Sequence, residues 1–446
     1  MKKRNLGIIK VAISLVTVHY GLGFLLGTSE AVYNTGLSGT LYSLSCGLGL
    51  IFLTLLVPFY WKNKLPIWDL LGSIYGKGVK NSISILSCLW MIGVVASQVL
   101  GAAYILSILG VSPIIGMIFF TIAISLVSQI QIKKLSSVFL FLLILSSVSL
   151  LTAIFKLSNF QLIKEVFVQT PQVILKQSLI SSLGIALPTI LITVLGMDFH
   201  QFVVQGKTRK SSILGTLAAG AALLLVSFLP TIVVRTAVAK QIIGSGIDGK
   251  QVIPYVLLYV GKSFGSNILG YFLVIALLAV AIGSGSGVTR IVSNTIIEFT
   301  FLPKIFRKKS IQLIIISLVV IFLALIGKTI ISLIVSFYVI YICGVLVPFL
   351  IYLVRKKIKI NVSSGSVQLS ILSGSISSFM VFVISKLDLA PINLSENIEF
   401  NMILIGLYVS LTAIVMTSFF TQFILLIPKY YKSKFQLSLR GSIKKQ

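Results

Sequence analysis

The sequence predicts an all-α polytopic membrane protein with about 12 transmembrane helices. Of its 446 residues, 57% are hydrophobic and only 10% are charged, and the mean hydropathy is +1.08. Water-soluble domains carry roughly 25% charged residues, so a soluble protein of this composition could not cover its own surface. The apolar runs are about 18–25 residues long and do not alternate, which matches helices crossing a bilayer core of about 30 Å. Because lipid offers the backbone no hydrogen bonds, helices are the expected structure.

Twelve spans follow one another with short loops between them. Their predicted ranges are 8–34, 38–61, 82–109, 112–131, 135–155, 179–205, 211–234, 264–289, 310–327, 330–354, 366–385 and 400–427. If the N-terminus is cytoplasmic, 28 of the 37 Lys and Arg residues fall on the cytoplasmic side. This distribution follows the positive-inside rule. We therefore expect a multi-pass protein of the cell (cytoplasmic) membrane with both termini cytoplasmic.

Charge and cysteine content argue against several other classes of protein. The net charge of +28 comes from short basic clusters between apolar runs, which signal topology rather than a nucleic-acid-binding face. Cys46, Cys88 and Cys343 are odd in number and lie inside apolar runs, so neither a disulfide nor a metal site is expected. The sequence contains no GxxxxGK[ST] motif of an ATPase. Without a catalytic constellation in the spans, we expect no enzyme activity and no cofactor.

Four segments outside the spans are distinctive. The start, MKKRNLGIIK, resembles the basic region of a signal peptide, but no small-residue cleavage site follows, which favours an uncleaved first span. Two long loops are predicted to be outside. Residues 157–177 form a mildly amphipathic loop, and 236–264 combine a turn-rich stretch with a short apolar helix. The tail 428–446 is basic and is expected to lie against anionic lipid.

The first and sixth spans contain residues that interrupt helices. Three glycines follow His19 in the first span, and the sixth contains Pro188 and Gly196. Transporters with two inverted repeats of five helices break the first helix of each repeat, and solute and ions bind at the exposed backbone ends. The first span starts inside and the sixth starts outside, as inverted repeats require. The predicted units are a first repeat at 8–155, a second, inverted repeat at 179–354, two accessory helices at 366–427 and the tail at 428–446.

Ionisable residues concentrate in the same two spans. The only histidines, His19 and His200, lie one in each, and Asp198 is the only acidic residue deep in a span. A charge at mid-bilayer costs about 2.5–3.5 kcal/mol on insertion scales, so such residues usually face the bundle interior or water. An alternative is that each histidine hydrogen-bonds a neighbouring helix and that Asp198 caps a helix near the cytoplasmic surface. Glu30 is expected to be interfacial.

The eighth span contains an unbroken run of glycine and serine at 283–287. Such a run is compatible with an ion site. It is equally compatible with a close-packing face, because small residues let helices approach one another.

Four further stretches are distinctive: FLLGTSEAVYNTGLSG, LPIWDLLGSIYG, HQFVVQGKTRKSSILG and VIPYVLLYVGKSFGSNILGYFLVIALLAVAIGSGSG. They resemble the sodium/solute symporter family, which includes bacterial proline and sugar symporters and has the LeuT-type five-plus-five inverted-repeat fold. These are similar to the family's first core helix, a cytoplasmic segment after the second, the end of the sixth, and the external loop helix with the eighth. Together they cover much of residues 8–300.

The resemblance implies a cation site and a solute site. The carbonyls of Thr17, Tyr20 and Ala281 and the hydroxyl of Ser284 would bind the cation. Gly285 stands where the family has a second hydroxyl, and a hard cation prefers five or six oxygens, so sodium coupling is open. The residues expected to contact solute are His19, Phe24, Asp198, His200 and Gln201.

The sequence thus predicts a secondary active transporter that moves a small polar solute by alternating access, coupled to Na+ or H+. Protonation of a histidine or of Asp198 would supply the coupling if the sodium site is defunct. The alternative is a transporter-like membrane sensor or binding protein that has lost ion coupling. The expected partners are a small solute and the lipid bilayer. Solute identity, transport direction and oligomeric state are left open.

Overall fold

A computed structural model describes residues 4–130, 132–244, 246–299, 302–358, 362–387, 389 and 394–419, with the side chains of 132–139 and 356–358 left out. Helices dominate these residues, and the β pairing recorded among them is an isolated bridge between Leu6 and Gly206. The predicted tail at 428–446 and the end of the last predicted span lie outside the described residues.

The helices follow the chain in a simple order. They are α1 (Ile8–His19), α2 (Leu22–Thr35), η1 (Gly36–Thr40), α3 (Leu41–Asn63), α4 (Ile67–Tyr75), α5 (Lys77–Ile108), α6 (Pro113–Val127), α7 (Ile132–Leu157), α8 (Phe160–Lys176), α9 (Leu179–Leu195), α10 (Met197–Val204), α11 (Arg209–Val226), α12 (Phe228–Ala239), η2 (Gly249–Gln251), α13 (Val252–Ser263), α14 (Asn267–Ile297), η3 (Lys304–Arg307), α15 (Lys309–Ile326), α16 (Ile330–Ile358) and α17 (Ser364–Lys386). A further helix covers Ile398–Phe419.

The predicted all-α polytopic fold is confirmed. In the part of the chain that the structure describes, nine helices are long and apolar enough to cross a membrane, or ten if α8 and α9, bent by 111°, form one span. The helices α1 and α6 are shorter but also apolar. Among the described residues, each of the twelve predicted ranges falls mainly on helix, and the number of crossings stays a prediction.

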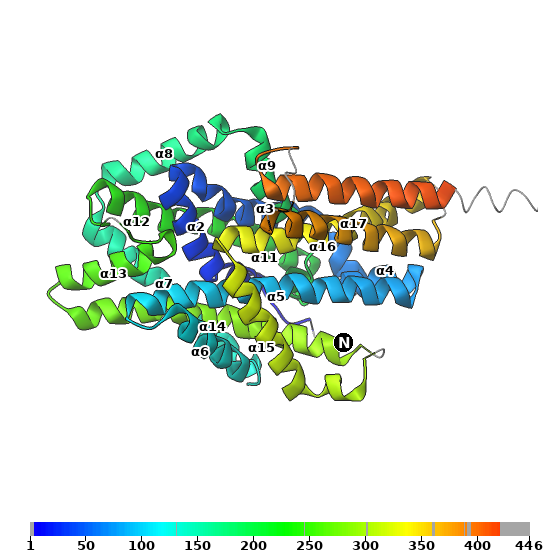
Figure 1. Ribbon diagram of the computed structural model, residues 1–446, viewed down its shortest axis with the longest axis horizontal. Helices are drawn as coiled ribbons and strands as arrows, with labels where there is room; N and C mark the ends of the chain where they lie inside the picture. Colours follow the sequence, from blue (N-terminus) through cyan, green and yellow to red (C-terminus); the bar gives the residue numbers. More distant parts are fainter. Residues whose placement is uncertain are drawn as a thin grey trace, which may run out of the picture.

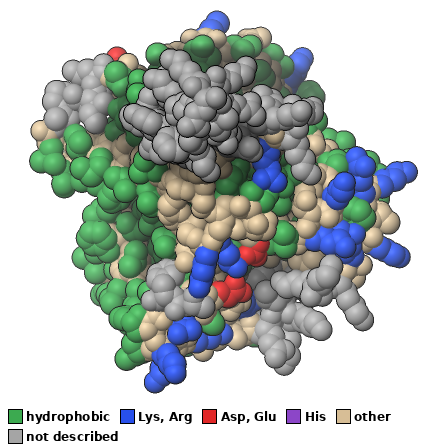
Figure 2. Space-filling model, turned by 90° about the vertical axis from the view of Figure 1, so that its right-hand side faces the viewer, with side chains coloured by type: hydrophobic (Ala, Val, Ile, Leu, Met, Phe, Trp, Pro, Cys, Tyr) green, Lys and Arg blue, Asp and Glu red, His purple; other side chains and the backbone are tan. Residues whose placement is uncertain are grey.

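The long helices lie side by side along one axis of the molecule (Figure 1). The most central is α16: 89% of its most apolar window is buried, against 28% for Ile398–Phe419. Large apolar side chains such as Phe52, Leu55 and Phe155 are exposed on the flanks, where hydrophobic side chains form broad patches (Figure 2). An apolar flank of this extent fits a protein whose solvent is lipid.

Of the two predicted long loops, 157–177 is instead helical, and 236–264 takes the predicted form. The amphipathic segment becomes α8, which contacts α12 at one end of the bundle (Figure 1). The turn-rich segment contains η2 and is followed by the apolar α13. Lysine and arginine side chains are prominent on the opposite end, which carries α4 (Figure 2). That basic end is the one the charge pattern predicts to be cytoplasmic.

Candidate functional site

The first predicted break lies between α1 and α2. The helix α1 ends at His19 and α2 begins at Leu22. The backbone N–H of Leu22 has no partner in its own helix and donates to Oε1 of Gln98 on α5, at 2.7 Å. A Cβ at Gly21 would lie 2.5 Å from Nε2 of Gln98, so a larger residue there would displace the Gln98 amide. The side chain of Gln98, on α5, therefore caps the second half of the broken helix.

The second predicted break lies between α9 and α10. The helix α9 ends at Leu195, and Gly196 adopts an extended conformation (φ −74°, ψ 131°) before α10 begins at Met197. Pro188 lies inside α9 without ending it. Breaks in the first and sixth spans are therefore confirmed, whereas α14 continues unbroken through 283–287.

The two broken helices contact each other. The rings of His19 on α1 and Phe199 on α10 stack with centroids 4.3 Å apart. At the same end of the bundle, Leu6 bridges to Gly206, and the N–H of Lys207 donates to the carbonyl of Leu6 at 2.8 Å. The chain before α1 and the chain after α10 are thus held together by backbone pairing.

Successive side chains of α10 point to different neighbours, as helical geometry requires. Phe199 faces His19, while the ring of His200 stacks on Tyr60 of α3 at 3.6 Å. Nε2 of His200 lies 2.7 Å from the carbonyl oxygen of Val194. His19 and His200 therefore stack on different partners, and the hydrogen bond of His200 goes to α9, the other half of its own broken span.

Asp198 faces the central helix. It is 3% exposed and close enough to Tyr338 and Tyr341 of α16 to interact with them electrostatically. Its Oδ1 atom has no hydrogen-bond partner among the described residues, and neither have Nδ1 of His200 and Nε2 of His19. Buried polar atoms are nearly always paired, so three unpaired ones beside two helix breaks call for an explanation.

The remaining predicted solute residues lie nearby. Gln201 donates from Nε2 to the backbone carbonyl of Asp198 at 3.1 Å. Phe24 is buried in α2 with its ring 5.5 Å from that of Tyr20. Sequence reasoning missed Gln98, Tyr338 and Tyr341, which lie in apolar runs without a motif. A search for polar residues inside the other spans would have included them.

The oxygens of the predicted cation site divide between two contacting helices, α1 and α14. Thr17 donates its hydroxyl to the carbonyl of Ile13, and Ser284 donates to Val280 at 3.1 Å. Tyr20 follows the end of α1, and Ala281 is buried in α14. Joint binding of a cation by these four residues stays a prediction.

Gly285 lies at a helix contact. A Cβ there would lie 2.6 Å from Cδ1 of Ile124 on α6, so the residue has the close-packing role that the sequence left open. No group of three or more His, Cys, Asp and Glu able to hold a metal ion occurs in the described chain.

Glu30 is more deeply placed than an interfacial residue. Its Oε1 lies 3.1 Å from Nζ of Lys250, and its Oε2 accepts from the backbone N–H of Ile330 at 2.9 Å. Burial alone would lower the pKa of Lys250, but the carboxylates of Glu30 and Asp248 outweigh it and raise that pKa. The loop that carries Lys250 is thus joined to α2 and to the start of α16 by a buried ion pair.

A cavity of about 240 Å³, here called the α2–α16 cavity, lies beside Glu30. It is lined by Gly27, Glu30, Ala31, Asn34, Thr35, Ser38, Gly39, Leu41, Tyr42, Gln177, Ser181, Ile185, Thr329, Ile331, Ser332, Val335 and Glu399. The lining comes mainly from one end of α2, α3, α9 and α16, the end that the charge pattern predicts to be outside.

The chain resembles known proteins in its fold but not in its sequence. No protein-family model and no curated protein sequence matches the chain. A Na+-coupled sialic acid symporter, solved substrate-bound and outward-open, is similar with a TM-score of 0.65 and 14% identity, over 93% of this chain and 90% of that one. A manganese transporter of Eremococcus coleocola is similar with a TM-score of 0.55 and 14% identity, over 92% of this chain and 94% of that one. The chain therefore has the fold of polytopic membrane transporters.

Proposed function

We propose that this protein is a secondary active transporter that moves a small polar solute across the cell membrane by alternating access. The observation that carries the proposal is the pair of broken helices, α1–α2 and α9–α10, in contact with each other. Non-helical backbone at membrane depth is tolerated only where it is buried in protein or lines a wet cavity. In transporters, such breaks bind solute and ions near the midplane. The fold shared with two transporters supports this proposal.

The proposed solute site lies around α10. Asp198, with its unpaired Oδ1, and His19, with its unpaired Nε2, offer hydrogen bonds that no described protein group takes up. Phe24, His200 and Gln201 complete the set. The two five-helix repeats (8–155 and 179–354), the sodium/solute symporter-like character and the cytoplasmic termini belong to the same proposal.

The coupling ion is Na+ or H+. A sodium ion would be held by Thr17, Tyr20, Ala281 and Ser284. A proton would be carried by Asp198 or a histidine, since histidine changes charge near neutral pH. Solid-supported membrane electrophysiology with a solute panel, with and without sodium and across a pH step, tests both. Solute-dependent currents support the proposal, and their absence across the whole panel contradicts it.

A membrane sensor or binding protein that has lost coupling is the second candidate. The glycine at position 285 favours it, because that position supplies no second hydroxyl for a cation. Uptake into proteoliposomes separates the two functions. A transporter accumulates solute, whereas a sensor binds it without accumulation.

A further inference from the structure

The lining of the α2–α16 cavity is electronegative in a strongly basic protein. Lys and Arg outnumber Asp and Glu by 37 to 9 in the sequence. Among the described residues that line the cavity, Glu30 and Glu399 are acidic, and none is Lys or Arg. The cavity therefore reverses the charge balance of the whole chain.

Lys250 compensates only part of that charge. It pairs with Glu30 at 3.1 Å and with Asp248 at 3.2 Å, so one ammonium group faces two carboxylates. Glu399 uses Oε1 to accept from the hydroxyl of Ser332 at 2.6 Å. A carboxylate has about four lone-pair sites, so Glu399 keeps acceptor capacity. Lys386 interacts with Glu399 electrostatically but does not belong to the cavity lining.

The cavity is too large for a bare ion and suits a small organic molecule. One water needs only about 10–15 Å³ of such space, and drug-sized sites measure about 300–1,000 Å³. At about 240 Å³, the cavity fits a solute of metabolite size. Hydroxyl and amide side chains line it as well, including those of Ser38, Asn34 and Gln177. These groups suit a solute that carries hydrogen-bonding groups besides its charge.

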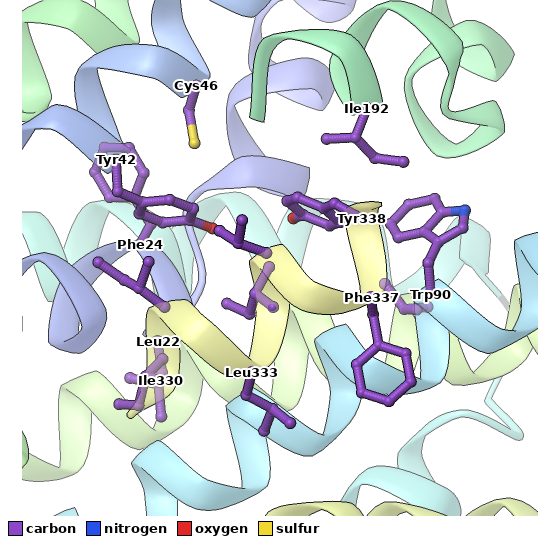
Figure 3. Packing of buried hydrophobic residues seen from close by; sticks show 14 of the residues in the cluster. Leu22, Phe24, Tyr42, Cys46, Trp90, Ile192, Ile330, Leu333, Phe337 and Tyr338 are labelled. Atoms are coloured by element: carbon purple, nitrogen blue, oxygen red, sulfur yellow. The ribbon is translucent and has the colours of Figure 1, made fainter. Parts of the chain in front are cut away.

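Two tyrosines connect the cavity to the second helix break. Tyr42 lines the cavity and lies close enough to Tyr338 of α16 to interact with it electrostatically. Figure 3 shows both rings on the same side of α16, with Phe24 close to Tyr42. Tyr338 is in turn within electrostatic range of Asp198, whose Oδ1 is buried and unpaired. Carboxylates thus lie on both sides of the tyrosine pair.

We propose that the α2–α16 cavity binds a small organic cation, bearing a protonated amine or a quaternary ammonium group, and that Asp198 receives its charge once the Tyr42–Tyr338 pair separates. This inference rests on the proposed transport function, whose solute it assigns to a class. Carboxylates at the entrance and at the buried end attract a cation and repel an anion. Phe24, one turn deeper than Gly27 on the same face of α2, would contact the apolar part of the solute.

Calorimetric titration of the full-length, detergent-solubilised protein tests the assignment. The probes are choline and a trio of similar size: butylammonium (cation), butyramide (neutral) and butyrate (anion). Choline or butylammonium is expected to bind at least tenfold more tightly than butyramide and butyrate. The variant Glu399→Gln should weaken cation binding about tenfold or more, since charge-assisted hydrogen bonds are the stronger ones.

The matched control is Glu396→Gln, because Glu396 is exposed, three residues from Glu399 and outside the cavity lining. It should leave the affinity unchanged. Binding of butyrate or butyramide as tight as that of the cations, absence of cation binding, or equal effects of the two variants would overturn the inference. Transport of a neutral or anionic solute would overturn it too while leaving the transport function intact. Cation binding without any solute current would reject transport alone.

Discussion

The half-helices α2 and α10 both follow a break in the chain, yet their ionisable side chains are paired differently, although the hydroxyls of Thr28 and Ser29 in α2 also lack a partner. At α2, the first N–H is capped by Gln98, and Glu30 is paired with Lys250 and with the N–H of Ile330. At α10, buried Asp198 and His200 each keep a polar atom without a hydrogen-bond partner.

This difference separates a structural role from a functional one. A buried group that is fully paired contributes to stability, whereas one left unpaired costs stability and persists only where something else requires it. Variants at the groups that hold α2 should therefore lower the stability of the protein. Variants in α10 should instead alter transport.

Replacing Lys250 should have the largest effect on stability. Lys250→Met leaves the carboxylate of Glu30 buried and uncompensated, which typically costs about 3–5 kcal/mol of the free energy of unfolding. Because the pKa of Lys250 is raised above its ordinary value of 10.5, the pair contributes fully below that value and is lost only as pH rises through the folded-state pKa. The loss of melting temperature should thus be equal at pH 7 and pH 9.

Lys240→Met is the control for this comparison, since Lys240 lies exposed in the same loop. Thermal unfolding in detergent, followed by intrinsic fluorescence, measures both variants. Equal melting temperatures for Lys250→Met and Lys240→Met would show that the buried pair does not hold α2.

Loss of the Gln98 cap should lower the free energy of unfolding by a measurable amount, but by less than loss of the ion pair. Gln98→Leu leaves the buried N–H of Leu22 without its partner, at a cost of about 1–3 kcal/mol in unfolding free energy. Gln201→Leu serves as the comparison, because Gln201 donates to a carbonyl of its own helix and is half-buried. If Gln201→Leu destabilised the protein as much as Gln98→Leu, the two breaks would not differ as described.

Ser284→Ala should have the smallest effect on stability, below about 0.5 kcal/mol, because its hydroxyl donates only to a carbonyl one turn earlier. If sodium binds at the predicted cation site, sodium stimulation of transport should nevertheless disappear. Ser286→Ala, two residues further along α14, should keep that stimulation. Unchanged sodium dependence in Ser284→Ala would remove α14 from the cation site.

Apolar runs and glycine positions were enough to predict the helices and the two breaks, because span length and backbone propensity are local properties. The partners at each break were not predictable. Gln98, Tyr338 and Tyr341 lie far along the chain from the breaks, and only packing brings them there. The run at 283–287 shows the same limit, because glycine and serine are typical of both a packing face and an ion site. Only the structure shows that Gly285 packs against Ile124.

The central claim is that the unpaired polar groups of α10 mark the transport site. Solid-supported membrane electrophysiology on Asp198→Asn tests it most directly, with Asp69→Asn as the control on the partly exposed ion pair between Asp69 and Lys80. The account predicts that Asp198→Asn folds with a melting temperature close to that of the unaltered protein but gives no solute-dependent current. The control should keep its current. Currents of equal size in both variants would contradict the account.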